Sequence, residues 1–169
     1  MSKTLILYTT KSGVTKDIAY QINKHLTTEA TIMSLKDLDD DVFFSCDTIV
    51  LGAPIYMGYI RKPMRKFVIK HMDILLQKNV FLYVVGVDTH IDLDKYLSMS
   101  YPQALLLHAR LIKHLGGEFR AENQSLLSRF IVNKIKEEFS KERELEEKIN
   151  IDMIKIFASN ILQNEKTEV

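Results

Sequence analysis

The beginning of the chain constrains its fold most, because a strand, a tight turn and a helix follow one another there without a gap. The apolar run Leu5-Ile6-Leu7-Tyr8 leads into a stretch rich in hydroxyl side chains, residues 9–15. After that stretch, apolar residues recur at helical spacing, namely Ile18, Ile22 and Leu26. We therefore expect a strand over 3–8 and a helix over 14–26. The turn between them lies at the carboxyl end of the strand.

This turn, residues 10–15, is called the hydroxyl turn below, and it could hold a phosphate group. Backbone N–H groups and hydroxyls would converge there, with the positive end of the helix dipole behind them. Thr10, Ser12 and Thr15 can each donate a hydroxyl proton, and Gly13 permits a positive φ or a close backbone approach. An ordinary helix N-cap uses the same residue types, so that interpretation stays open at this point.

Three other kinds of site are excluded by residue identity. A Walker A loop and a dinucleotide fingerprint need more glycines than Gly13 alone. A phosphatase-type loop needs a nucleophilic cysteine here, whereas the only cysteine is Cys46.

Composition favours a single globular domain over residues 1–169. The chain is 46% hydrophobic and carries a net charge of +1, so it has no basic field that would suggest nucleic acid as a partner. One cysteine cannot form an internal disulfide and suits a reducing cytoplasm. We expect neither a signal peptide nor a membrane span, since no apolar run approaches the roughly 18 residues that a span needs. The expected location is therefore the cytoplasm.

Apolar runs and helical patterns alternate along the rest of the chain. This alternation predicts an α/β fold with a doubly wound, five-stranded parallel sheet. The order that we expect for it is 2-1-3-4-5, one of the two common orders of such sheets. An extra amphipathic helix over 126–139 would precede the last helix. We expect the remaining strands over 30–35, 48–52, 80–86 and 118–121, helices over 63–75, 102–115 and 142–162, and loops over 37–41, 53–60 and 87–100.

In this strand order, ligands bind beyond the carboxyl ends of the first and third strands. The hydroxyl turn would then lie beside the loop after the third strand, with the loop that begins at Val87 on the third side. Response regulators share the order but need carboxylates at these strand ends, where this chain has Tyr8-Thr9-Thr10 and Gly52-Ala53-Pro54. A phospho-acceptor site is therefore excluded. Flavin mononucleotide (FMN) fits, with its phosphate on the hydroxyl turn and its ring against the other two loops.

The pattern Ile6-Leu7-Tyr8-x-Thr10-x-x-Gly13-x-Thr15 resembles the FMN-phosphate signature of the flavodoxins. The resemblance implies a flavodoxin-like fold with FMN as cofactor. Lys11 departs from the family pattern, in which small residues are usual at this position. The phosphate would be held by Thr10, Lys11, Ser12, Gly13, Val14 and Thr15. The ring would lie against Ala53, Pro54, Ile55, Tyr56, Met57, Gly58, Val87, Asp88 and Thr89. No residue is singled out as catalytic, and no metal site is expected.

Two longer blocks, Leu7–Ala19 and Gly52–His71, resemble the menaquinone-dependent protoporphyrinogen oxidases, which are flavodoxin-like enzymes of haem biosynthesis. A third match is Arg129-Phe130-Ile131 with Ile135. This resemblance implies an oxidoreductase that passes electrons from a reduced substrate through FMN to a quinone or another small-molecule acceptor. The alternative is a flavodoxin electron shuttle with a redox protein partner. Such shuttles tend to be strongly acidic, so a net charge of +1 speaks against it.

Two further expectations concern the surroundings of the flavin. The amphipathic stretch 126–139 would either contact a membrane surface peripherally or pack on its own domain. The loop over 87–92 contains no aromatic residue, so the outer face of the flavin ring would be open to a flat substrate.

Overall fold

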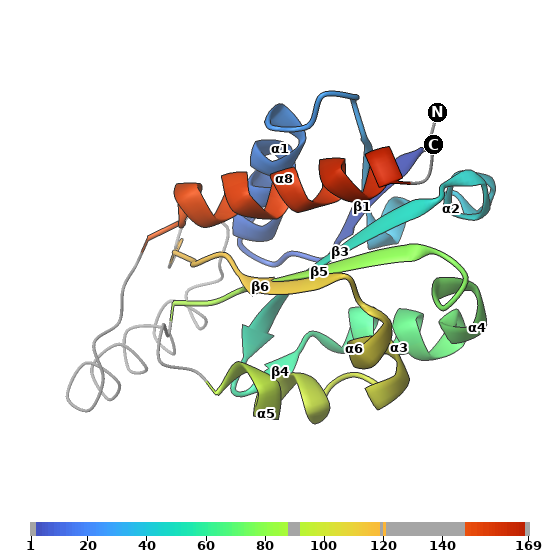
Figure 1. Ribbon diagram of the computed structural model, residues 1–169. Helices are drawn as coiled ribbons and strands as arrows, with labels where there is room; N and C mark the ends of the chain where they lie inside the picture. Colours follow the sequence, from blue (N-terminus) through green and yellow to red (C-terminus); the bar gives the residue numbers. More distant parts are fainter. Residues whose placement is uncertain (1–2, 88–91, 119, 121–147, 168–169) are drawn as a thin grey trace.

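Five parallel strands form the centre of the molecule, in the order β2-β1-β3-β5-β6 (Figure 1). The computed structural model describes residues 3–87, 92–118, 120 and 148–167. The predicted doubly wound sheet and its strand order are confirmed. A short sixth strand, β4 (Tyr59–Ile60), pairs antiparallel with the end of β3. The parallel strands are β1 (Thr4–Tyr8), β2 (Thr31–Ser34), β3 (Thr48–Tyr56), β5 (Asn79–Val85) and β6 (Leu111–His114).

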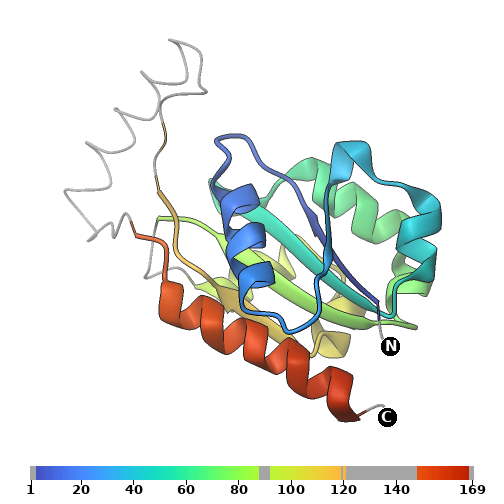
Figure 2. The same ribbon diagram turned by 90° about the horizontal axis from the view of Figure 1, so that it is seen from above.

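Helices cover both faces of the sheet, and each face has its own apolar core (Figures 1 and 2). α1 (Val14–Lys24) and α8 (Ile151–Thr167) lie on one face, where Ile18 and Phe157 pack against strand residues such as Phe81. On the other face, residues such as Met64 and Leu105 pack against Leu51. The helices there are α2 (Asp40–Ser45), α3 (Lys62–Lys70), α4 (Met72–Leu75), α5 (Leu93–Ser98) and α6 (Gln103–His108).

The three central strands are buried on both faces, which explains why they are nearly continuous apolar runs. Every residue of β1 and β5 is buried, and so are the first seven of β3. A strand covered on both sides needs apolar side chains at every position and not only at alternate ones. These runs therefore allow β1, β3 and β5 to be predicted from the sequence.

The last parallel strand lies elsewhere than predicted. It is formed by Leu111–His114, inside the predicted helix 102–115, whereas Glu118 and Arg120, the described residues of the range 118–121, lie in no strand. α6 ends at His108, after which β6 pairs with Phe81–Val84 of β5. Leu106, Ala109 and Ile112 all pack against the same core, so their helical spacing continues across the boundary between helix and strand.

Other boundaries also differ from the predictions. The acidic stretch 37–41 is not simply a loop, because the carboxylate of Asp39 accepts from Asp41 N–H at 2.8 Å and starts α2. Much of 53–60 continues β3 and forms β4, while α5 occupies part of 87–100. The predicted helix 63–75 is split into α3 and α4, and α3 begins at Lys62.

The last helix begins at Ile151 and not at residue 142. Ile149, which lies within the predicted range of that helix, instead forms a β-bridge with Gly116. Ile156 of α8 is 48% exposed. The predicted helix 126–139, including the match at Arg129-Phe130-Ile131, lies outside the described residues.

Candidate functional site

Three connections leave the sheet at the same edge. Tyr8 of β1 is in register with Gly52 of β3, and Gly52 is in register with Tyr83 of β5. The chain beyond these positions forms the hydroxyl turn, the β3–β4 turn (residues 56–59) and the segment that begins at Gly86. The three segments singled out from the sequence therefore follow neighbouring strand ends, although Asp88, Thr89 and His90 lie outside the described residues.

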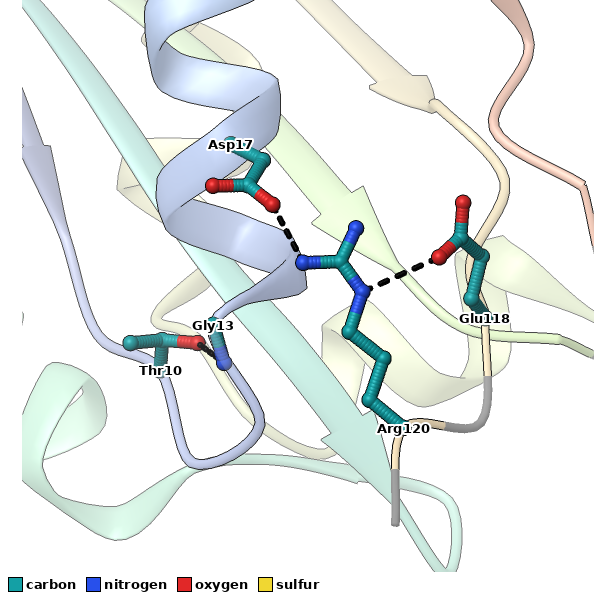
Figure 3. Close-up of polar contacts among 5 residues, drawn as sticks. All are labelled: Thr10, Gly13, Asp17, Glu118 and Arg120. Carbon is teal, nitrogen blue, oxygen red and sulfur yellow. Dashed lines mark hydrogen bonds and ion pairs between the residues drawn. The ribbon is translucent and has the colours of Figure 1, made fainter. Parts of the chain in front are cut away.

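The hydroxyl turn is closed by a hydrogen bond of its own. Gly13 N–H donates to the Thr10 hydroxyl oxygen at 2.9 Å (Figure 3). Gly13 has a φ of 90°, which a residue with a side chain rarely adopts, and its carbonyl accepts from Asp17 N–H at 3.0 Å as α1 begins. Because a hydroxyl that accepts one hydrogen bond keeps its own proton, Thr10 can still donate to a ligand.

The turn also presents backbone donors without acceptors. Within the described part of the chain, the N–H groups of Lys11, Ser12, Val14 and Thr15 donate no hydrogen bond. The hydroxyl of Thr9, which is only 5% exposed, has no partner there either. Unpaired donors at the first turn of a helix, together with the helix dipole, form a site that favours an anion.

The residues of the turn differ in how far solvent reaches them. Lys11 is exposed, and Thr10, Ser12 and Gly13 are half-buried. Val14 and Thr15 are almost completely buried, at 2% and 1% exposure. The half-buried residues are therefore the ones best placed to meet an incoming ligand.

Tyr83, in strand β5, supports the hydroxyl turn through a hydrogen bond. Its hydroxyl donates to the Thr15 carbonyl at 2.9 Å, and burial raises the pKa of Tyr83 well above its ordinary value, so the hydroxyl keeps its proton. Gly52 makes room for the Tyr83 ring, because a Cβ at Gly52 would lie 2.0 Å from a ring carbon. Sequence reasoning missed this pair, although a glycine within an apolar strand does signal close approach by another group.

Two arginines that sequence reasoning also missed contact the hydroxyl turn or lie next to it. The Arg61 guanidinium donates to the Thr10 carbonyl. On the other side, Arg120 lies near Gly13 and pairs with Asp17 and with Glu118, the latter at 3.0 Å (Figure 3). The hydrogen bond to Asp17 is the main reason why the pKa of Arg120 is raised.

The β3–β4 turn is tight and carries exposed apolar groups. Met57 and Gly58 have φ values of 50° and 82°, and the Met57 side chain is 91% exposed. Tyr96 of α5 packs on Gly58, since a Cβ there would lie 3.1 Å from its ring. The loop after β5 contains no aromatic residue and was expected to leave the outer face of the flavin ring open. Tyr96, further along the chain, was not among the predicted site residues, yet it brings an aromatic ring to the β3–β4 turn.

Three of the histidines in the described ranges have structural surroundings. His71 packs between Phe43 and Phe67, and His108 and His114 contact the carbonyls of Lys78 and Gly86 at 2.8 and 2.9 Å. In those same ranges no group of three or more His, Cys, Asp or Glu side chains could hold a metal ion, and no helix is long and apolar enough to cross a membrane.

A doubly wound parallel sheet in the order β2-β1-β3-β5-β6 has the strand order of the flavodoxin fold. A family model described as the flavodoxin domain matches residues 5–146, so the chain belongs to the flavodoxin family. Solved structures agree with this fold. Oxidised flavodoxin 2 from Bacillus cereus is 20% identical, with a TM-score of 0.62 over 96% of this chain and 99% of that one. The rubredoxin oxygen:oxidoreductase from Desulfovibrio gigas is 12% identical, with a TM-score of 0.58 over 99% of this chain and 37% of that one.

One characterised relative carries an enzyme name. The protoporphyrinogen IX dehydrogenase (quinone) of Escherichia coli K12 is 32% identical over 72 residues. The match spans 41% of this chain and 40% of the relative, which is less than half of either protein.

Proposed function

We propose that the chain is an FMN-dependent oxidoreductase that folds as one FMN-binding domain. The observation that carries this proposal is the hydroxyl turn at the amino end of α1, where the N–H groups of Lys11, Ser12, Val14 and Thr15 lack acceptors within the described residues. Membership of the flavodoxin family supports FMN as the ligand whose phosphate occupies the turn.

The residues of the turn fit a phosphate group. Among the described residues, a Cβ at Gly13 would meet only the Arg120 guanidinium, at 3.9 Å, so these residues leave room beside this glycine for a ligand. The Thr10 and Ser12 hydroxyls and the N–H groups of Lys11, Val14 and Thr15 would donate to the phosphate oxygens. Hydrogen bonds to a charged acceptor contribute about 1.5–3 kcal/mol each.

The flavin ring would lie against the segments that follow β3 and β5. Ala53, Pro54 and Ile55 lead into the β3–β4 turn, where Tyr56, Met57 and Gly58 would border the ring. Val87, with Asp88 and Thr89 after it, would lie on the other side. Bound FMN supplies the redox chemistry, and the chain binds it, orients it and limits its contact with water.

The name of the Escherichia coli relative supports a more specific proposal: electrons from a porphyrinogen-type substrate are passed to a quinone. The alternative is an electron shuttle between proteins, favoured by the similarity to Bacillus cereus flavodoxin 2 over nearly the full length of both chains. We favour the enzyme because α3, which begins just after β4, is rich in cations. Arg61, Lys62, Arg65, Lys66 and Lys70 lie within ten residues that include no Asp or Glu.

The proposal is tested with the purified protein. Its visible spectrum should show bound flavin, and it should oxidise protoporphyrinogen IX anaerobically with a menaquinone analogue as acceptor. A yellow protein that is inactive with porphyrinogen but exchanges electrons rapidly with a flavodoxin reductase would establish the shuttle instead. A colourless protein that FMN does not reconstitute would contradict both functions.

A further inference from the structure

Arg61 connects the two segments on which the proposed FMN site depends. Its guanidinium donates to the carbonyl of Thr10 in the hydroxyl turn. Its backbone N–H donates to the carbonyl of Pro54, near the end of β3, at 3.3 Å. Arg61 itself is fixed in place, because it lies between β4 and α3 and its own carbonyl accepts the Arg65 N–H of α3 at 3.2 Å.

The hydrogen bond to Thr10 determines the direction of the next amide. In a trans peptide the carbonyl and the following N–H point in opposite directions. With the Thr10 carbonyl held by Arg61, the N–H of Lys11 points away from Arg61. That N–H has no acceptor in the described ranges, as expected for a donor left available to a ligand.

The charge of Arg61 is also less compensated than that of Arg120. Arg120 pairs with the carboxylates of Asp17 and Glu118. Among the described residues, no carboxylate lies within ion-pair distance of Arg61, whose side-chain partner is a neutral carbonyl. A positive charge left uncompensated beside an anion-binding turn attracts a phosphate, which carries two negative charges near pH 7.

Arg61 also acts on the ring side of the site. Burial raises the pKa of Tyr56 in the β3–β4 turn, and the positive charge of Arg61 opposes that rise. The same guanidinium therefore interacts with the hydroxyl turn by a hydrogen bond and with the β3–β4 turn through its charge. Its position between the two turns suits a residue that sets how they lie relative to each other.

We propose that Arg61 is a positioning residue that orients the Thr10–Lys11 peptide toward the flavin phosphate and makes the site selective for FMN over riboflavin. This inference rests on the proposed function, because it presupposes that FMN is the ligand. It assigns to one side chain, remote in sequence from the hydroxyl turn, a role that the flavodoxin signature does not include.

The test compares two ligands that differ only in the phosphate. The dissociation constants of FMN and riboflavin are measured by fluorescence titration of the apo-protein, for the wild type and for Arg61→Met, Arg61→Lys and Arg110→Met. Arg110 is the matched control, because it precedes β6 at the opposite edge of the sheet and donates to Asn79. The ³¹P NMR signal of bound FMN and the thermal midpoint are recorded for each variant.

For Arg61→Met we expect FMN affinity to fall about tenfold or more, the size of one charge-assisted hydrogen bond, and riboflavin affinity to fall much less. Arg61→Lys keeps the charge and a donor and should recover part of the loss. The ³¹P signal should move in Arg61→Met and stay in place in Arg110→Met.

Two results would overturn the inference and leave the proposed function intact. One is an Arg61→Met protein that binds FMN as tightly as the wild type. The other is an equal loss of FMN and riboflavin affinity, which would make Arg61 a general support of the fold. A wild-type protein that binds neither ligand would instead refute the proposed function, and the inference with it.

Discussion

Tyr83 and Gly52 form a unit at the residue scale that can be tested without any cofactor. Tyr83→Phe removes the donor to the buried Thr15 carbonyl and should lower the free energy of unfolding by about 1–3 kcal/mol. Gly52→Ala should lower the free energy of unfolding by at least as much, because the new Cβ would overlap the Tyr83 ring at 2.0 Å. Urea denaturation measures both.

Gly86→Ala is the matched control for Gly52→Ala, since its Cβ would meet His114 at an ordinary contact distance of 3.5 Å. Equal stability of Gly52→Ala and Gly86→Ala would show that the Tyr83 ring is not packed against Gly52.

His71 should make the stability of the fold depend on pH. Burial, with help from Lys70, lowers the pKa of His71 below its ordinary value, so the folded protein binds this proton less readily than the unfolded chain. Stability should therefore fall as the pH drops below about 6.5, and this contribution should level off below the lowered pKa. His71→Phe keeps a ring between Phe43 and Phe67 and removes the titration.

The measurement is the thermal midpoint at pH 7.5 and pH 5.5 for wild type and His71→Phe. The thermal midpoint of the wild type should fall more between pH 7.5 and pH 5.5 than that of the variant. An equal fall of the thermal midpoint in both proteins would show that His71 does not contribute to the pH dependence of stability.

Whether a residue of the site could be predicted from the sequence depends on how far along the chain its partner lies. Thr10 and Gly13 could be predicted, because a strand end followed by a helix start places them without reference to the rest of the fold. Arg61, Tyr83 and Arg120 could not, because they bond across 51, 68 and 103 positions to the hydroxyl turn or to α1. Such contacts depend on the packing of the whole sheet.

At the element scale, the end of α2 depends on Lys78, which lies in the connection between α4 and β5. Lys78 donates to the carbonyl of Phe44 at 3.0 Å and to that of Cys46, and so satisfies carbonyls at the end of α2. Lys78→Met should lower the free energy of unfolding by about 1–3 kcal/mol, because these acceptors and the negative end of the helix lose their cation.

Lys66→Met, at an exposed position of α3, is the control and should change stability by no more than about 0.5 kcal/mol. A Lys78→Met protein as stable as this control would rule out a capping role for Lys78. Hydrogen exchange localised to residues 40–46 would show whether α2 is the element affected.

The β3–β4 turn should influence the redox properties of bound FMN. Gly58→Val places a β-branched side chain where φ is 82° and where a Cβ meets Tyr96 at 3.1 Å, so the turn must change shape. Gly58→Asn meets the same ring but tolerates positive φ better. The midpoint potentials of bound FMN should therefore move more in Gly58→Val than in Gly58→Asn, as measured by redox titration.

Identical potentials in the wild type and in both variants would place this turn away from the redox-active part of the ring. Retained FMN affinity in Gly58→Val would show that a shifted potential does not result from loss of the cofactor.

The elements themselves were predictable where burial on both faces left an unbroken apolar run, as in β1, β3 and β5. The boundary between α6 and β6 was not, because Leu105, Leu106, Ala109 and Ile112 keep one spacing through a helix and into a strand. No glycine or proline separates α6 from β6. Pairing with β5 decides the strand, and single-sequence periodicity does not contain that information.

For the molecule as a whole, the sheet order accounts for the position of the site. The chain crosses from one side of β1 to the other on going from β2 to β3, so the hydroxyl turn and the end of β3 are neighbours. The alternation of strands and helices predicted the doubly wound sheet, and the position of the site followed from the strand order expected for it. The charge around the site could not be predicted in this way. The cations of α3 lie at the edge of the site only because β4 turns the chain back along β3.

The central claim is that the chain binds FMN with its phosphate in the hydroxyl turn. The most direct measurement is calorimetric titration of the apo-protein with FMN, for the wild type and for Thr10→Ala combined with Ser12→Ala. Thr31→Ala, at an exposed position on the edge strand β2, is the control. The double variant loses two hydroxyls that we assign to the phosphate, at about 1.5–3 kcal/mol each, so FMN should bind at least about tenfold more weakly while Thr31→Ala binds as the wild type does. Unchanged FMN affinity in a folded double variant, or no binding by the wild type, would contradict the account.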